Sequence, residues 1–410
     1  MPEFLELLAP TAALKVLIDE VAKVGVIEQI SSVNSLGRVI AHGITAPFPL
    51  PGFHRSTVDG YAVRSVDTYA ASESLPVYLK LIGEIPMGQQ ASIALGLGEC
   101  ALIHTGGMLP EGADAVVMVE FTQGLESGDV EILRSVAGGE NILRIGEDVI
   151  KGQEVISPGV RIRAAEIGGL IALGILQVSV FRKPIIAIIS SGDEVISPKE
   201  PLLPGQVYDV NSYSLAATIT EAGGQPIHYG IVPDRIDSLH SLAIKALAES
   251  DMLIITAGSS ASTRDLTAQV INNLGRPGVL VHGINIRPGK PTILAMCDSK
   301  PVIGLPGNPV SALVIALLFV KPVIHRLSGI QMELPAGKIR ARLSLNLPSQ
   351  AGREDWIPVH LSTKGDCRIA EPVLGKSNLI FTLVRANGLA RIEADATGLS
   401  AGEEVEAILF

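Results

Sequence analysis

Aromatic side chains and positive charge are both scarce in this sequence. Aromatic residues make up 4% of the 410 residues, and the formal net charge is −10. Proteins that bind nucleic acids need a basic face for the phosphate backbone, and those that bind single strands also need aromatic rings for the bases. The composition therefore argues against a nucleic-acid-binding protein, although a local cluster of Arg and Lys can still hold a small anion.

Cysteine is also scarce, and its spacing excludes two kinds of structural site. The three cysteines, Cys100, Cys297 and Cys367, lie far apart and form no CxxC pair. His104 and His282 lack the partner spacing of metal ligands. A disulfide framework or a structural zinc site would need closely patterned cysteines or histidines, so neither is predicted.

No segment has the features of a targeting or membrane-spanning sequence. The first ten residues contain two glutamates and no basic residue, which is not the pattern of a signal peptide. The longest apolar run, at about 310–320, is too short to cross a bilayer. We therefore expect a cytoplasmic protein with no membrane partner.

The order of apolar and polar residues divides the chain into regions with different predicted secondary structure. Residues 11–24 predict an amphipathic helix, and 46–140 contain short β-like runs broken by Gly and Pro. From 185 to 320, apolar strands alternate with helices, which predicts a parallel sheet covered on both faces. After about 330 the pattern returns to short strands. The predicted fold class is multidomain α/β plus β.

Three loops that follow predicted strands of the α/β region share an unusual chemistry. They are Ser190-Ser191-Gly192-Asp193-Glu194, the small-residue segment 257–262 that leads to Thr263-Arg264-Asp265, and Leu305-Pro306-Gly307-Asn308-Pro309. Ligands of open α/β sheets bind beyond the carboxyl ends of the strands, and small residues let backbone N–H groups approach an anion. We infer a site for phosphate or another oxyanion, with Asp193, Glu194 and Asp265 near it to hold a divalent cation.

Simpler interpretations of these features remain open. Each loop alone is also typical of a tight turn, and Asn308 followed by Pro309 is a good helix start. The segment from Arg287 to Pro291 adds Arg287 and Lys290, but it could equally be a solvated turn. The sequence contains no Walker A loop, HExxH, GxSxG or Rossmann glycine fingerprint, so the commonest nucleotide-binding and hydrolase classes lack their motifs.

Seven segments, taken in order, resemble the blocks that characterise the MoeA family of molybdenum insertases, which includes the gephyrin E domain. They are RSTVDGYAVR at 55–64, TGGMLPEGADAVVMVE at 105–120, NILRIGED at 141–148, SSGDEV at 190–195, YDVN at 208–211, IRPGKP at 286–291 and GLPGNPVSAL at 304–313. The resemblance runs from about residue 10 to the C-terminus. Val58 stands where the family usually has Met, Arg287 stands where it has Lys, and the loop at 256–265 also departs from the family pattern.

The resemblance implies a reaction and a set of site residues. Adenylated molybdopterin and molybdate would be the substrates, AMP would be released, and Mg²⁺ would assist. The acidic residues implied as catalytic are Asp59, Asp148, Glu194, Asp234 and Asp265, of which Asp59, Glu194 and Asp265 would bind the metal. The residues implied or inferred to bind substrate are Thr105, Arg144, Ser190, Gly192, Asp193, Gly258, Ser259, Arg287, Lys290, Pro306, Gly307, Asn308, Pro309, Arg353 and Ser377.

Several of these residues also have an ordinary structural explanation. Asp59 could form a turn with Gly60, Asp148 could cap a local turn, and Asp234 could cap the following helix. Thr105 could reflect β-propensity alone.

The resemblance also implies a domain organisation and an assembly. A discontinuous linking domain would occupy 1–45 and 141–178, a β-rich domain 46–140, a MogA-like doubly wound α/β domain 179–330, and a β-barrel-like domain 331–410. The family forms elongated homodimers in which the DGYA loop of one subunit faces the α/β domain of the other. A MogA-type adenylyltransferase is a further expected partner.

Three other functions stay open at this point. The protein could be a non-catalytic scaffold or carrier of the gephyrin E type. It could be a related adenylyltransferase, whose fold would resemble only 179–330. It could also insert tungstate, an oxyanion with nearly the size and charge of molybdate.

Overall fold

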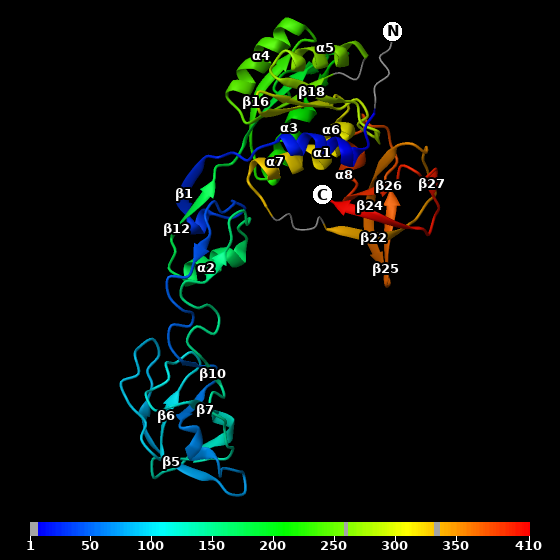
Figure 1. Ribbon diagram of the computed structural model, residues 1–410. Helices are drawn as coiled ribbons and strands as arrows, with labels where there is room; N and C mark the ends of the chain where they lie inside the picture. Colours follow the sequence, from blue (N-terminus) through cyan, green and yellow to red (C-terminus); the bar gives the residue numbers. More distant parts are fainter. Residues whose placement is uncertain (1–6, 258–260, 332–336) are drawn as a thin grey trace. The chain divides into compact units, whose positions relative to one another are not determined.

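The computed structural model describes residues 7–257, 261–331 and 337–410, and for 261–265 it describes the backbone alone. The chain forms two compact units (Figure 1). The larger unit contains Met1–His42, Pro158–Ile167 and Gln177–Phe410, and the smaller unit contains Gly43–Ser157 and Gly168–Leu176. This division is coarser than the four predicted domains, whose boundaries stay a prediction.

The centre of the larger unit is a six-stranded sheet. Its strands, in spatial order, are β16 (Gln225–Val232), β13 (Ile185–Ser191), β17 (Met252–Ala257), β21 (Lys300–Pro306), β20 (Ile293–Cys297) and β18 (Pro277–His282). The first four run parallel, as the alternation of strands and helices predicts. Strands β20 and β18 run antiparallel to their neighbours and extend the sheet beyond the predicted strands.

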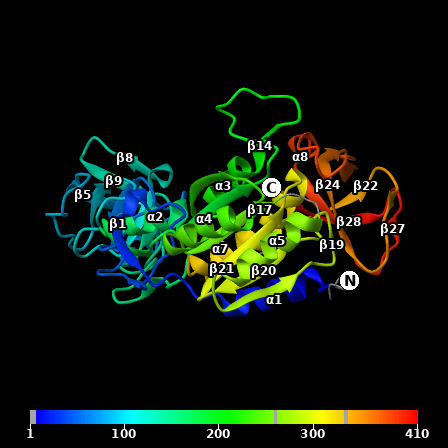
Figure 2. The same cartoon turned by 90° about the horizontal axis from the view of Figure 1, so that it is seen from above.

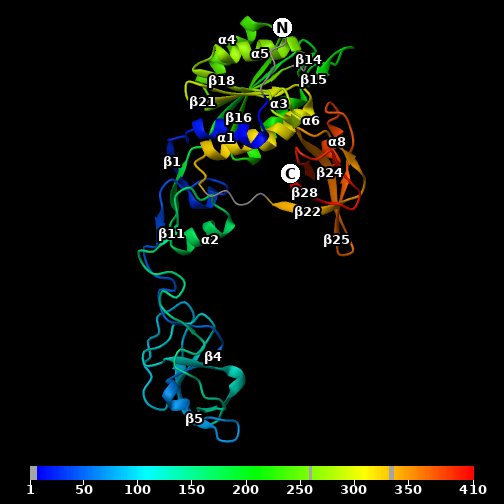
Figure 3. The same ribbon diagram turned by 45° about the vertical axis from the view of Figure 1, so that its right-hand side comes forward.

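Helices cover both faces of this sheet, as Figures 1 and 3 show. The helical elements are α1 (Pro10–Glu20), α3 (Val210–Glu221), α4 (Ile236–Ala248), α5 (Ala261–Asn272), α6 (Pro309–Ile315), the π-helical η4 (Ala316–Val320) and α7 (Lys321–Leu327). Alternate residues of β13 enter opposite cores: Ile186 and Ile188 pack with α1, α3, α6 and α7, whereas Ala187 and Ile189 pack with α4 and α5. This alternation follows from the two-residue period of a strand and explains why the sheet strands are apolar throughout.

One helix among the described residues, Pro309–Leu327, is long and apolar enough to cross a membrane by length and composition. It continues past the apolar run through Lys321 to Leu327, so it is longer than the run alone indicates. Most of it is buried, and its side chains belong to the core on one face of the sheet. These contacts are those of a core helix in a globular domain.

The end of the chain forms a closed β-barrel in the same unit (Figure 3). Its strands are β24 (Glu354–Lys364), β25 (Cys367–Pro372), β22 (Lys338–Leu343), β28 (Glu404–Leu409) and β26 (Gly388–Ile392), and β26 pairs with β24 to close the sheet. The strand β19 (Ile286–Arg287), which follows β18, adds to the edge of β24. The short elements β23 (Leu347–Pro348), β27 (Gly398–Leu399) and α8 (Phe381–Val384) complete this region.

Other short elements complete the larger unit. They are β1 (Ile27–Ser31) paired with β12 (Gln177–Phe181), η1 (Ser32–Asn34), and β14 (Val195–Ile196) paired with β15 (Val207–Tyr208). The division between the units falls within α2 (Ala164–Ala172). Figure 2 shows that the segment between β14 and β15 leaves the α/β region as a long loop.

The smaller unit is built on a second six-stranded sheet, as its short β-like runs predict. In spatial order the strands are β7 (Ala115–Met118), β4 (Gly60–Val63), β6 (Glu99–Ile103), β5 (Val77–Glu84), β9 (Asp129–Ile132) and β8 (Thr122–Gly124). The smaller unit also contains η2 (Ser65–Thr68), η3 (Val119–Phe121), β3 (Arg55–Ser56) with β10 (Ile142–Leu143), and β2 (Ile44–Thr45) with β11 (Glu154–Ile156). The DGYA segment therefore lies at the start of a central strand, β4.

Gly60 is the one residue of that segment whose lack of a side chain the fold requires. A Cβ atom at this position would lie 1.9 Å from the carbonyl oxygen of Val117 on the neighbouring strand β7. Both partners are backbone atoms held in a sheet, so the clash cannot be relieved by a side-chain rotation. The glycine therefore serves the packing of this sheet.

We expect Gly60→Ala to destabilise the protein by about 3 kcal/mol or more, because forcing β4 away from the edge strand β7 costs at least as much as overpacking a core. Gly124→Ala, in β8 of the same sheet, is the matched control, since a Cβ there meets no atom within 4 Å. Urea denaturation of both variants measures the difference. Equal stability of the two variants would contradict the packing argument.

Candidate functional site

The topology of the α/β sheet places a crevice at the carboxyl ends of its parallel strands. From β13 the chain passes to β16 on one side, and then to β17 on the other side of β13. The order of strands therefore reverses at β13, which is where ligands bind in open α/β sheets. The strands end at Ser191, Val232, Ala257 and Pro306, so the loops predicted to bind an oxyanion all start at this edge.

A chain of buried hydroxyl and carboxylate groups fixes the floor of the crevice. The hydroxyl of Thr256 donates to Ser190 Oγ at 3.3 Å, and Ser190 donates to Asp209 Oδ2 at 2.8 Å. The other carboxylate oxygen of Asp209 accepts from the backbone N–H of Ser212 at 3.0 Å and caps α3. Because Ser190 donates its only hydroxyl proton to Asp209, its hydroxyl can only accept a hydrogen bond from a ligand.

The loop after β13 brings two predicted acidic residues together. Ser191 donates its hydroxyl to Asp234 Oδ1 at 2.5 Å, and the backbone N–H of Asp234 donates to Asp193 Oδ1 at 3.3 Å. The N-cap of α4 is Arg235, so Asp234 does not cap the helix that follows. Gly192 is buried beside them and donates its N–H to Val232, whereas Asp193 and Glu194 are exposed.

The predicted metal ligands do not form a complete cluster within the described residues. There, no group of three His, Cys, Asp or Glu side chains is arranged to hold a metal ion. Asp59 and Glu194 belong to different compact units. Gly258, Ser259 and the side chain of Asp265 lie outside the described residues, so the metal set Asp59, Glu194 and Asp265 stays a prediction.

The loop after β21 brings a residue of the C-terminal region to the same edge. Asn308 is the N-cap of α6 and Pro309 lies in its first turn, as the sequence predicts. The amide of Asn308, however, donates to Ser377 Oγ at 3.1 Å instead of capping the helix, and Ser377 O accepts from Val310 N at 3.0 Å. Pro306 and Gly307 connect β21 to this helix. The predicted residues Asn308 and Ser377 are therefore neighbours.

Asn211, in the first turn of α3, lies at this edge and was not among the predicted site residues. Its amide nitrogen donates to the carbonyl of Gly307 at 2.8 Å. Its Oδ1 atom is buried and has no hydrogen-bond partner among the described residues. A buried acceptor without a partner is rare, and the YDVN motif at 208–211 is the sequence signal that points to it.

The predicted cations gather where the α/β region meets the C-terminal barrel. Arg353 donates to the carboxylate of Asp355 at 2.9 Å, and Arg287 lies 3.7 Å from the same carboxylate. Lys290 is exposed two residues beyond a cis peptide bond between Arg287 and Pro288. The sequence predicts these cations but not the carboxylate that they share.

Gly289 explains why the segment 287–291 lies so close to the core. A Cβ atom at this position would lie 2.5 Å from the side chain of Ile315 in α6, and the backbone has a φ of +114°. Only glycine satisfies both conditions. The glycine therefore holds the loop that carries Arg287 and Lys290 against the helix that follows the LPGNP loop.

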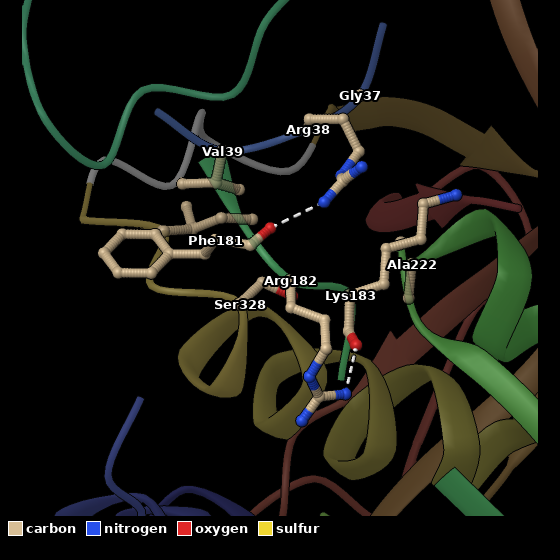
Figure 4. A pocket seen from close by; sticks show the side chains of 10 residues that line it. Gly37, Arg38, Val39, Phe181, Arg182, Lys183, Ala222 and Ser328 are labelled. Atoms are coloured by element: carbon tan, nitrogen blue, oxygen red, sulfur yellow. Dashed lines mark hydrogen bonds between the residues drawn. The ribbon is translucent and has the colours of Figure 1, made fainter. Parts of the chain in front are cut away.

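A separate cavity, drawn in Figure 4, lies between the β1–β12 region and the C-terminal ends of α3 and α7. Its volume of about 10 Å³ admits a single water molecule at most. Arg38 donates to the carbonyl of Phe181, and Arg182 donates to the carbonyl of Lys183 and to Asp251. Because both guanidinium groups already have partners, this cavity is not a candidate ligand site.

In the smaller unit, Asp59 accepts a hydrogen bond from a distant motif. Its Oδ1 atom accepts from the backbone N–H of Thr105 at 2.8 Å and lies 3.6 Å from Nδ1 of His104. His104 also contacts Glu84 through Nε2 at 3.0 Å. The Thr105 N–H, and secondarily the Thr105 hydroxyl and the neighbouring imidazole, lower the pKa of Asp59, while its side chain stays 63% exposed. Asp59 is thus an ionised carboxylate that joins two motifs.

Asp148 and Arg144 lie in the turn that follows β10 and are both exposed. The backbone N–H of Asp148 donates to the carbonyl of Leu50 at 3.0 Å, and that of Arg144 donates to Glu147 at 2.8 Å. The guanidinium of Arg144 lies over Gly139, where a Cβ would come within 2.5 Å of it. Both predicted side chains therefore remain available to a ligand.

We predict that His104→Ala raises the pKa of Asp59 only partly toward its ordinary value, because the Thr105 N–H is the largest cause of the shift. Titration of ¹³C-labelled aspartate carboxyls by NMR, with Asp59→Asn for assignment, measures it. The ionised form favours the folded state above the pKa of the unfolded chain, and that contribution is lost as pH falls through the lower, folded pKa. Complete return to the ordinary value in His104→Ala would show that the imidazole dominates.

Comparisons with known proteins agree along the whole chain. Three family models match it in succession: the MoeA N-terminal region (domain I and II) at 8–174, a probable molybdopterin binding domain at 187–326, and the MoeA C-terminal region (domain IV) at 340–410. A molybdopterin molybdenumtransferase of Nostoc sp. is 35% identical over 90% of this chain and 85% of the relative. One of Bacillus subtilis is 33% identical over 95% and 91%.

Solved structures confirm the fold class. The crystal structure of a molybdopterin biosynthesis MoeA protein from Pyrococcus horikoshii OT3 covers 99% of this chain and 100% of its own, with 33% identity and a TM-score of 0.86. A second structure from the same species gives 39% identity and a TM-score of 0.81 over 98% of this chain. Family models, relatives and structures together show that the chain belongs to the MoeA family.

Proposed function

We propose that this protein is a molybdopterin molybdenumtransferase, which inserts molybdate into adenylated molybdopterin and releases AMP. The relatives from Nostoc sp., Bacillus subtilis and Haemophilus influenzae carry that name, at 31–35% identity over at least 90% of this chain. The observation that carries the proposal is that Asn308 bonds to Ser377, and that Arg287 and Arg353 share Asp355, at the edge where the sheet ends. Amide, hydroxyl and guanidinium donors at one edge suit an oxyanion substrate.

The arrangement supports different binding roles for two groups of predicted residues, one for the oxyanion and one for the phosphate groups. Arg287, Arg353 and Lys290 would hold the oxyanion, because each offers N–H groups and positive charge in an otherwise acidic chain. The LPGNP loop leads into the start of α6, where the positive end of the helix dipole favours an anion. We assign the phosphate groups of the adenylated substrate to this loop. Ser190 and Gly192 would border the substrate and let it approach by their small size, because the Ser190 hydroxyl proton and the Gly192 N–H already have acceptors.

We place the Mg²⁺ of the predicted set Asp59, Glu194 and Asp265 beside the loop that follows β13. Asp193 and Asp234 are in contact there, and Glu194 is exposed beside them, so carboxylate oxygens, the ligands Mg²⁺ prefers, are at hand. When bound, the ion would neutralise charge on the phosphoanhydride as it is cleaved. Ser191 orients Asp234 by its 2.5 Å hydrogen bond, and Asp193 is oriented by the backbone of Asp234.

The assembly and the location of the protein belong to the same proposal. We propose a homodimer in which Asp59, Thr105, Arg144 and Asp148 of one subunit complete the α/β site of the other. The exposed, ionised carboxylate of Asp59 supports this, because it has the charge and the access that a cation or a polar substrate needs. A cytoplasmic location and a MogA-type adenylyltransferase that supplies the substrate are further parts of the proposal.

Purified protein incubated with adenylated molybdopterin, Mg²⁺ and molybdate should release AMP only when the oxyanion is present. We expect Lys290→Ala to reduce the rate at low molybdate by roughly tenfold, since it removes one charge-assisted contact. Liquid chromatography of AMP measures both. Binding without AMP release would indicate a carrier, and faster release with tungstate than with molybdate would indicate a tungsten-inserting enzyme.

A complementation test addresses the shared site. Asp59→Asn and Lys290→Ala subunits, each inactive or weak alone, should regain roughly a quarter of the sites after random mixing, because half of the dimers are mixed and each holds one intact site. AMP release before and after mixing measures the recovery. No regain, with mass spectrometry confirming mixed dimers, would contradict a site shared between subunits.

A further inference from the structure

The contact between the α/β region and the C-terminal barrel brings one carboxylate between two arginines. Strand β19 pairs in parallel with β24, so that Ile286 lies beside Glu354 and Arg287 beside Asp355. The backbone N–H of Glu354 donates to the carbonyl of Asn285 at 3.1 Å and extends this pairing. The arginine of one region and the aspartate of the other are therefore placed by backbone hydrogen bonds.

Asp355 is completely buried, and each of its oxygens has partners. Oδ1 accepts from Nε of Arg353 at 2.9 Å. Oδ2 accepts from the hydroxyl of Ser349 at 3.0 Å and lies 3.7 Å from Nη1 of Arg287. The side chain of Asp355 has no solvent exposure, whereas those of Arg353 and Arg287 are 30% and 60% exposed. The buried carboxylate thus holds Arg353 by a hydrogen bond and lies within ion-pair distance of Arg287.

The outer parts of both guanidinium groups are free to bind an anion. Arg353 uses only its Nε–H on Asp355, and the remaining N–H groups contact no acceptor among the residues that the structure describes. The same holds for Arg287 beyond its contact with Asp355. A guanidinium whose inner edge is fixed by a carboxylate loses less conformational freedom when its outer edge meets an oxyanion.

We propose that Asp355 is a positioning residue that holds Arg287 and Arg353 in a single oxyanion-binding pair. The inference rests on the proposed function, because it assigns the pair to the molybdate of that reaction. Asp355 itself does not touch the substrate. It acts through the two arginines, and its negative charge reduces the positive potential that they present to an anion.

Two physical effects of removing the Asp355 charge have opposite signs, which makes the proposal testable. The loss of a negative charge increases the local positive potential, and this effect alone would tighten anion binding. The loss of the anchor frees two long side chains and weakens the binding. Since a hydrogen bond to a charged group is worth about tenfold or more in an equilibrium constant, we expect the second effect to dominate.

The experiment compares Asp355→Asn with Glu354→Gln in the full chain. Glu354 is the matched control because it is the adjacent buried carboxylate of the same strand, but its partners are Arg391 and Trp356 instead of the two outward arginines. Isothermal titration with molybdate alone gives the dissociation constant, and AMP release gives kcat and KM for molybdate. Thermal unfolding of each variant records its stability.

Asp355→Asn should raise the dissociation constant and the KM for molybdate about tenfold and change kcat by less than about threefold, whereas Glu354→Gln should leave molybdate binding within about twofold of the original chain. Equal molybdate binding by the two variants, or tighter binding by Asp355→Asn, would overturn the proposal. If Asp355→Asn does not fold, Ser349→Ala decides: by releasing Oδ2 it should raise the dissociation constant about threefold, and no change would overturn the proposal.

The outcomes separate this inference from the proposed function. An unsubstituted chain that binds molybdate without releasing AMP would contradict the transferase function but still allow the comparison of Asp355→Asn with Glu354→Gln. An unsubstituted chain that releases AMP normally while both variants behave alike would contradict the role of Asp355 alone. A chain that does not bind molybdate at all would overturn the inference.

Discussion

Parallel alignment of β13, β16, β17 and β21 is the constraint on which the larger unit depends. Parallel strands must be joined by crossovers, so every strand ends at the same edge and every connecting helix begins there. Residues far apart in the sequence, such as Ser191, Asp234 and Asn308, are thereby gathered without needing attraction between them. The hydrogen-bond chain from Thr256 to Asp209 uses the same edge to fix the start of α3.

The C-terminal barrel completes this edge by contributing polar groups of its own. It is attached by the short parallel pairing of β19 with β24 and by the bonds from Asn308 and Val310 to Ser377. Both attachments involve residues that we assign to the site. The contacts that hold the two regions together are thus also the contacts that place the donor groups for an oxyanion.

Much of the fold was predictable because it follows from local patterns. The alternation of apolar strands and helices between 185 and 320 sufficed for the parallel sheet, and the short runs of 46–140 sufficed for a β-rich region. The antiparallel strands β18 and β20 were not predicted, because they lack a helix between them and carry no distinct alternation. The helix predicted at 11–24 begins at Pro10 but ends at Glu20, since Val21 turns to an extended conformation.

The site was predictable as a set of motifs but not as a set of contacts. The sequence identified Arg287 and Arg353 as cations, but Asp355 became visible only with the β19–β24 register. Asp234 had two explanations. The N-cap of α4 is Arg235, which excludes the helix cap, and Asp234 instead accepts a hydrogen bond from Ser191. For Asp59, the sequence offered a local turn with Gly60 as an explanation, but its carboxylate accepts a hydrogen bond from the distant Thr105. In each case the deciding partner lies on a distant segment, where sequence spacing carries no information.

The bond between Asn308 and Ser377 has a consequence for how the protein can be divided into fragments. A fragment that ends before the C-terminal region keeps the α/β sheet but loses Trp356, Leu383 and Leu389 from one of its two cores. Such a piece would lack the hydroxyl that occupies the Asn308 amide, and the freed amide side chain could turn back onto its own helix start. Crystal structures or ligand screens of that fragment would then describe a loop in which the Asn308 side chain caps its own helix. Compounds selected against that fragment would fit a surface that the intact chain does not present.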